Sequence, residues 1–158
     1  MDKYLTHFLD VPPDPRAFAD EVDVVSKFPD GYEASLKSSK WKDRKEALDG
    51  MLSVLQATLR IKDAPSLGDL AKTLANLIHK DANVACVMTA ANCLEALAKG
   101  LGDPLGKHHE SIVPPMLERL KERKATVTDT IGVALDAVFN TVSHTMCLLE
   151  DYPTSCAP

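Results

Sequence analysis

Apolar residues recur every three or four positions through most of this chain, which is the spacing of the buried face of an α-helix. In one clear example the apolar positions are Ala47, Leu48, Met51, Leu52 and Leu55. The same pattern, read between glycine, proline and capping residues, predicts helices over residues 15–28, 32–37, 41–58, 67–79, 84–99, 112–120 and 127–142. We therefore expect an all-α protein.

Local signals mark where several of these helices begin. Ser38 and Ser39 precede the helix that starts near Trp41, and Ser66 and Asn83 precede the two that follow. Side-chain oxygens at such positions can accept hydrogen bonds from the free N–H groups of the first helical turn. In the first segment Asp14 would cap a helix that has Pro15 at its first position. Further along the chain, Pro114 and Pro115 must either kink their helix or mark its start.

The helices repeat in pairs along the chain. A shift of 43 positions places Leu74 on Leu117 and Val84 on Val127, among other apolar matches. A period between roughly 40 and 47 residues is typical of HEAT repeats, in which stacked helical hairpins share one continuous core. We expect about three hairpins, over residues 31–62, 66–102 and 106–143, within a helical region at 15–143. A loose lead-in at 1–14 and an irregular tail at 144–158 would flank them.

Composition agrees with one packed helical domain. The chain has 158 residues, of which 45% are hydrophobic and only 5% aromatic, so leucine, alanine and valine carry the core. No apolar run approaches the roughly 20 residues of a membrane span, and the start lacks the apolar core of a signal peptide. Cys86 and Cys93 lie seven apart on one predicted helix as core residues, while Cys147 and Cys156 fall in the predicted tail. We expect no disulfide framework and a cytoplasmic protein.

Stacking three hairpins would align the links within the units along one edge of the solenoid. Those links are residues 38–41, 80–83 and 123–126. They would gather a basic ridge that carries one aromatic side chain, although the net charge of the whole chain is −5. The expected members of this ridge are Lys40, Trp41, Lys42, Lys80, Arg123 and Lys124. The ridge is either three solvated turns or, as we favour, a docking surface for an acidic partner.

At these positions the sequence resembles the TOG domain, a HEAT-repeat module of microtubule polymerases. Residues 39–48 (SKWKDRKEAL) look like its opening, and residues 24–29 (VVSKFP) are similar to the lead-in of a second TOG domain in an array. Later segments match in order: residues 80–84 (KDANV), 113–114 (VP), 120–124 (LKERK) and 134–139 (ALDAVF). The resemblance covers about residues 14–143.

The resemblance implies non-catalytic binding of the αβ-tubulin heterodimer through the edge formed by these loops. By motif match, Lys40, Trp41 and Lys42 would form the first contact, against β-tubulin. The later contacts would come from Lys80, Asn83, Val84, Arg123, Lys124 and Val127. It also implies a place on microtubules in the cytoplasm, at spindle poles or plus ends.

TOG domains have about six such units, so the resemblance implies a truncated domain that lacks its fourth to sixth loops. We expect reduced affinity for a whole heterodimer, no polymerase activity from this chain alone, and marginal stability or self-association through an uncapped last repeat.

Two other classes of function were weighed against tubulin binding. The first is an enzyme, for which His108, His109 and Glu110 form the most reactive-looking cluster. Adjacent helical residues point about 100° apart, so this pair does not converge on one metal, and we interpret it as solvated. We expect no catalytic residue, metal, cofactor, small-molecule substrate, nucleic acid or membrane partner. The second alternative is a HEAT scaffold that binds a protein other than tubulin, or a fragment with little tubulin affinity.

Overall fold

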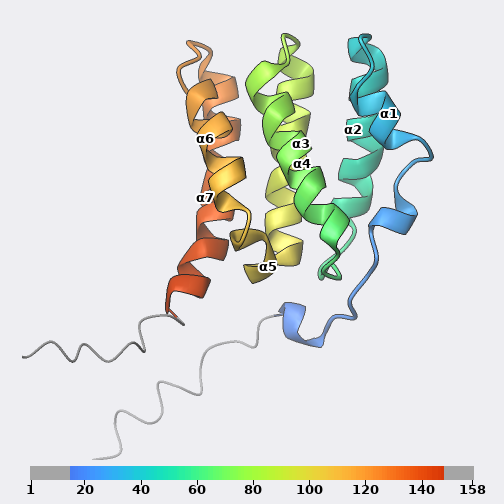
Figure 1. Ribbon diagram of the computed structural model, residues 1–158, viewed down its shortest axis with the longest axis vertical. Helices are drawn as coiled ribbons and strands as arrows, with labels where there is room; N and C mark the ends of the chain where they lie inside the picture. Colours follow the sequence, from blue (N-terminus) through green and yellow to red (C-terminus); the bar gives the residue numbers. More distant parts are fainter. Residues whose placement is uncertain (1–14, 148–158) are drawn as a thin grey trace, which may run out of the picture.

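The computed structural model describes residues 15–147 and places them in a row of helical hairpins stacked side by side (Figure 1). The first hairpin contains α1 (Tyr32–Leu36) and α2 (Trp41–Gln56), and the second contains α3 (Pro65–Lys80) and α4 (Val84–Leu101). A single-turn helix, α5 (Asp103–Gly106), leads into the third, formed by α6 (His109–Arg119) and α7 (Ala125–Cys147). The prediction of an all-α HEAT-type solenoid with three hairpins is confirmed.

The hairpins pack as two layers of helices. One layer is α2, α4 and α7, in which α4 packs against both neighbours, and α3 and α6 lie side by side in the other. Helix α4 is the centre of the core and buries eleven of its residues, from Cys86 to Leu101. By length and composition α4 could cross a membrane, but 61% of it is buried inside the protein, as in the core helix of a soluble domain. A buried helix of this kind is apolar on nearly all sides.

The segment before α1 differs from the predicted helix over residues 15–28. Two short 3-10 helices, η2 (Pro15–Phe18) and η3 (Val25–Lys27), flank an extended stretch instead. Val22 pairs with Ile61 in a parallel bridge, accepting a hydrogen bond from Lys62 N and donating one to Arg60 O. Val22, expected on the apolar face of that helix, is strand-like instead, because its backbone pairs with Ile61. Val25, expected on the same face, begins η3.

Three helix boundaries also differ from the prediction. Helix α3 begins at Pro65 with Ala64 at the N-cap, so Ser66 is not its cap. Pro114 and Pro115 lie inside α6 and do not mark its start. Helix α7 continues to Cys147, so positions 144–147 of the expected irregular tail are helical. The rest of that tail, residues 148–158, and the lead-in at 1–14 lie outside the described residues.

Candidate protein-binding edge

The links within the three hairpins lie along one edge of the solenoid, at the top of Figure 1. They are the α1–α2 loop at residues 37–40, the α3–α4 loop at 81–83 and the α6–α7 loop at 120–124. We call this surface the loop edge. The prediction that three successive turns share one rim is confirmed, and the links between hairpins lie at the other end of the helices.

Six of the nine predicted contact residues are exposed at the loop edge: Lys40, Trp41, Lys42, Lys80, Arg123 and Lys124. Asn83 and Val84 are half-buried there. Within residues 15–147, no ion pair neutralises any of the five cations in this set. The loop edge therefore presents five cations that form no ion pair among the described residues, together with one exposed indole.

Val127 does not belong to this surface, although it was predicted as a contact residue. Its exposed fraction is 0%, and it lies in the core cluster with Ile131 and Ala134. The side chain is the first of the apolar stripe of α7, so it points toward the other helices while Arg123 and Lys124 remain in solvent. The sequence match placed it near the third loop, but its direction on the helix removes it from the edge.

The side chain of Ser38 orders the first loop. Lys40 occupies the N-cap of α2 with an extended backbone, and no side-chain oxygen caps the helix from that position. Ser38 Oγ instead accepts a hydrogen bond from Lys40 N and donates one to Asp43 Oδ2 at 2.9 Å. The serines thus do not act as N-caps in the expected way, but Ser38 still orders the turn immediately before Trp41.

In the second loop, Asn83 caps α4 as predicted. Its Oδ1 accepts hydrogen bonds from Ala85 N at 2.9 Å and Cys86 N at 3.3 Å. The loop backbone is fixed a second time because Asp81 Oδ1 accepts from Asn83 N at 2.8 Å. These bonds satisfy N–H groups that would otherwise lack a partner at the start of α4.

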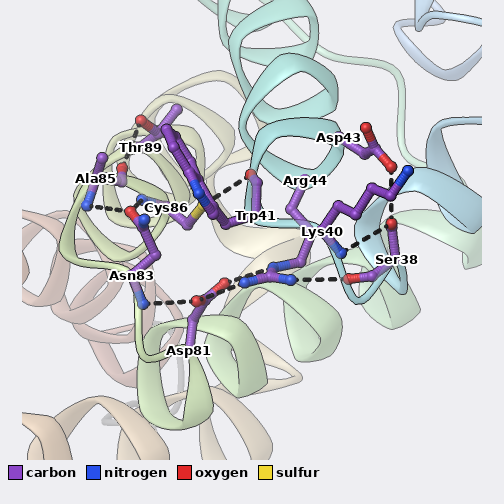
Figure 2. Close-up of polar contacts among 10 residues, drawn as sticks. All are labelled: Ser38, Lys40, Trp41, Asp43, Arg44, Asp81, Asn83, Ala85, Cys86 and Thr89. Carbon is purple, nitrogen blue, oxygen red and sulfur yellow. Dashed lines mark hydrogen bonds and ion pairs between the residues drawn. The ribbon is translucent and has the colours of Figure 1, made fainter.

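A two-point ion pair joins the first loop to the second (Figure 2). Arg44, in the first turn of α2, donates from Nε to Asp81 Oδ2 at 2.8 Å and from NH2 to Asp81 Oδ1 at 2.9 Å. Its remaining NH1 donates to Ser38 O at 2.8 Å. The side chains of Arg44 and Asp81 are 16% and 1% exposed. A planar guanidinium suits such paired recognition of a carboxylate.

The electrostatics of Asp81 follow from these contacts. Burial by itself would raise the pKa of Asp81, because a charged carboxylate loses hydration. Hydrogen bonds from Arg44 and from Asn83 N, with the positive charges of Arg44 and Arg119, outweigh burial, so the pKa lies below its ordinary value. Asp81 is therefore ionised at neutral pH and holds both loops as an anion.

The third loop is connected to the second through Arg119 at the end of α6. Its NH1 donates to His79 O at 3.2 Å, and NH2 lies 3.3 Å from Glu122 Oε2. Lys121 pairs with Glu118 within the same turn. Arg123 and Lys124 are left as the cations that this loop presents to solvent.

Trp41 lies where the first and second loops meet. In Figure 2 its indole extends from the start of α2 toward the first two turns of α4, where Ala85, Cys86 and Thr89 lie. Its carbonyl oxygen accepts from Cys86 Sγ at 3.4 Å, and the residue is 45% exposed. About half of this side chain is packed and half is open, which is the arrangement of an aromatic anchor that keeps its orientation before a partner arrives.

Four residues that organise the edge were not predicted as site residues: Arg44, Asp81, Cys86 and Arg119. The partner of Arg44 lies 37 positions away in the next hairpin. Local spacing carries no signal of such a contact. The repeat does supply a signal of such a contact, because neighbouring units of a solenoid stack on each other.

Within residues 15–147, no group of three or more histidine, cysteine or carboxylate side chains is placed to hold a metal ion. His108 and His109 were interpreted as solvated, but both are half-buried. His109 Nδ1 is 2.7 Å from Gly106 O, and the ring of His108 covers Gly68.

Comparison with known proteins shows several relatives. The chain is 43% identical over 124 residues to "Spindle pole body component alp14" of Schizosaccharomyces pombe, which covers 78% of this chain and 15% of that protein. It is 37% identical over 130 residues to "Zygote defective protein 9" of Caenorhabditis elegans, covering 82% of this chain and 9% of that protein. The chain thus spans a small part of the length of these relatives. No family model matches it.

Solved structures show the same fold. One, from "Structural Basis of Microtubule Plus End Tracking by XMAP215, CLIP-170 and EB1", matches with a TM-score of 0.75 at 31% identity over 87% of this chain and 58% of that one. Another is from "Structural Basis of Tubulin Recruitment and Assembly by Microtubule Polymerases with Tumor Overexpressed Gene (TOG) Domain Arrays". It matches with a TM-score of 0.74 at 31% identity over 97% of this chain and 31% of that one. The chain therefore belongs to the TOG-domain family of microtubule polymerases, whose fold is a solenoid of HEAT repeats.

Proposed function

We propose that this chain binds tubulin through its loop edge, without catalysing a reaction. The observation that carries the proposal is the half-exposed Trp41 among Lys40, Lys42, Lys80, Arg123 and Lys124, on a fold shared with a structure of tubulin recruitment. Aromatic anchors dominate the energetics of protein interfaces, and uncompensated cations steer an acidic partner into register. Asn83 and Val84 would border the contact.

The geometry supports contact at successive points along one line. The three loops lie side by side on one rim. Arg44 bonds to Asp81 between the first and second hairpins, and Arg119 bonds to His79 O between the third and the second. A partner that binds along this edge would contact the three loops at fixed distances from one another. Such a preformed edge loses little conformational entropy on binding, which favours affinity.

In the cell, this activity would place the chain on microtubules in the cytoplasm, including spindle poles or plus ends. The domain would contribute to microtubule dynamics by capturing tubulin subunits. A protein partner of another kind is the alternative, and it would use either this edge or the opposite end of the helices.

Size-exclusion co-elution of the purified chain with αβ-tubulin tests the proposal. The wild-type chain should co-elute at low ionic strength, and Trp41→Ala should abolish or greatly weaken the complex. Leu59→Ala is the matched control, because Leu59 is another exposed apolar residue and follows the C-terminal end of α2, opposite Trp41. Co-elution that Trp41→Ala leaves intact would refute binding through the loop edge, and no complex with tubulin at all would refute the function itself.

A further inference from the structure

One closed circuit of contacts connects the first two loops and returns to Trp41 (Figure 2). It begins at Arg44, whose guanidinium bonds to Ser38 O in the first loop and to both oxygens of Asp81 in the second. Asp81 then accepts from Asn83 N, and Asn83 Oδ1 accepts from Cys86 N. Cys86 Sγ donates to Trp41 O, which completes the circuit three residues before Arg44.

The circuit fixes one distance and one position at the loop edge, and both would affect how a partner fits. Because Arg44 and Trp41 share the first turn of α2, the two bonds to Asp81 set the distance between that turn and the α3–α4 loop. The bond from Cys86 sets the position of the Trp41 backbone on the first turn of α4. Trp41 is 45% exposed, whereas the side chain of Asp81 is almost fully buried.

We propose that the Arg44–Asp81 pair is a positioning device for binding, which holds Trp41 and the second loop at the spacing the partner requires. The side chains of the pair are mostly buried, 16% exposed for Arg44 and 1% for Asp81, so the pair would act through the residues that it holds in place. The part of this inference that concerns affinity rests on the proposed function of the loop edge. The part that concerns the position of Trp41 does not depend on that function. Removing one member of a buried ion pair also lowers stability, so the test has to separate positioning of the indole from stability.

Trp41 provides a direct readout, because it is the only tryptophan in the chain. Its emission maximum and its quenching by acrylamide report how the indole is covered. Three variants test the pair: Arg44→Lys, Asp81→Asn and the double variant Arg44→Lys/Asp81→Asn. Lysine keeps the charge but cannot bond to both oxygens of Asp81 and also to Ser38 O. Each single variant should increase acrylamide quenching about twofold and broaden the emission, measured where circular dichroism shows full folding.

Two control variants separate positioning from stability. Arg60→Gln removes another ion pair between distant residues, Arg60–Glu21, outside the loop edge. Leu105→Ala removes a fully buried side chain from α5, opposite the loop edge, and lowers stability by cavity formation. Both should leave the Trp41 signals unchanged below the melting temperature. Unchanged Trp41 signals in Arg44→Lys and Asp81→Asn, or the same change in Leu105→Ala, would overturn the proposal.

Binding gives the second arm. Affinity for tubulin should fall about tenfold in Arg44→Lys and about tenfold in Asp81→Asn. In the double variant the loss should be smaller than the product of the two single losses, because the effects of two residues that contact each other are not additive. Leu105→Ala and Arg60→Gln should bind as the wild type does. Full affinity in both single variants would overturn the positioning role. Failure of the wild-type chain to bind would instead overturn the proposed function, while the Trp41 signals would still decide whether the pair positions the indole.

Discussion

Arg44 and Asp81 form a two-point ion pair across 37 positions of sequence, with N–O distances of 2.8 and 2.9 Å. The carboxylate of Asp81 is almost fully buried, and three hydrogen bonds from protein N–H groups converge on its oxygens. The pair joins two hairpins at the edge where their loops lie. It therefore connects the chemistry of the loop edge to the stability of the whole stack.

The first prediction concerns acid. The pKa of Asp81 is lower in the folded state than its ordinary value of about 3.9 in an unfolded chain. Its contribution to stability is therefore complete above about pH 4 and is lost as pH falls through the lower, folded-state pKa. Melting temperatures measured between pH 2 and 7 should fall steeply at the acid end. In Asp81→Asn, which should lose about 3 kcal/mol at neutral pH, that acid limb should be shallower. An identical slope in both proteins would contradict the assignment.

The second prediction concerns Val127, which the structure moves from the predicted contact surface into the core. Val127→Ala should lower the free energy of unfolding by about 2 kcal/mol, because it leaves a small cavity. Chemical denaturation measures this loss. Lys124→Ala, three positions earlier and exposed, should change stability by less than about 0.5 kcal/mol. If Val127→Ala weakens tubulin binding in the folded state while stability is unchanged, the residue belongs to the contact after all.

The third prediction compares two helical glycines that differ in their surroundings. A Cβ built at Gly132 in α7 meets no atom within 4 Å, whereas one built at Gly100 in α4 lies 2.6 Å from Ile61 Cδ1. Gly132→Ala should stabilise the protein by about 0.5–1 kcal/mol through helix propensity. Gly100→Ala should destabilise it by about 1–3 kcal/mol because the side chain overpacks the core. Thermal denaturation of the two variants provides the check, and equal shifts in one direction would refute it.

The fourth prediction concerns the two core thiols. Burial raises the pKa of Cys93 to about 12, with a smaller effect from Asp49. Burial also raises the pKa of Cys86, and the negative charge of Asp81 adds to the effect. Since the thiolate is the reactive form, both residues should react with iodoacetamide at pH 8 far more slowly than in the denatured chain. Peptide mass mapping assigns the label to each cysteine. Rapid labelling of either one in the native protein would show that α4 opens readily.

The fifth prediction concerns charge at the loop edge. The affinity for tubulin should decrease as salt concentration rises, because screening weakens attraction between exposed charges. Lys124→Glu should weaken binding about tenfold at low salt and by less at high salt. Lys62→Glu is the control, since Lys62 is also exposed but lies in the link between the first two hairpins, away from the loop edge. Equal effects of the two reversals would show that net charge matters and the loop edge does not.

The sequence by itself determined the helices, the pairing of helices into hairpins and the edge on which the loops lie. Leu48, Met51 and Leu55 repeat at helical spacing, so one face of α2 had to be buried. The repeat then required successive hairpins to stack in the same direction, which placed Trp41, Lys80 and Lys124 on one rim. The local pattern identified Asn83 as a cap, although the same pattern failed at Ser66, where Ala64 occupies the N-cap.

Only the tertiary structure decided contacts between residues far apart in sequence and the direction of side chains near helix ends. The extended stretch at Val22 depends on Ile61, and the place of Arg44 depends on Asp81. Val127 matched a contact position by its place in the sequence, yet the rotation of α7 buries it. Helical periodicity reports which face of a helix is apolar, but it does not report which distant residue completes a hydrogen bond or an ion pair, and these pairings set the geometry of the loop edge.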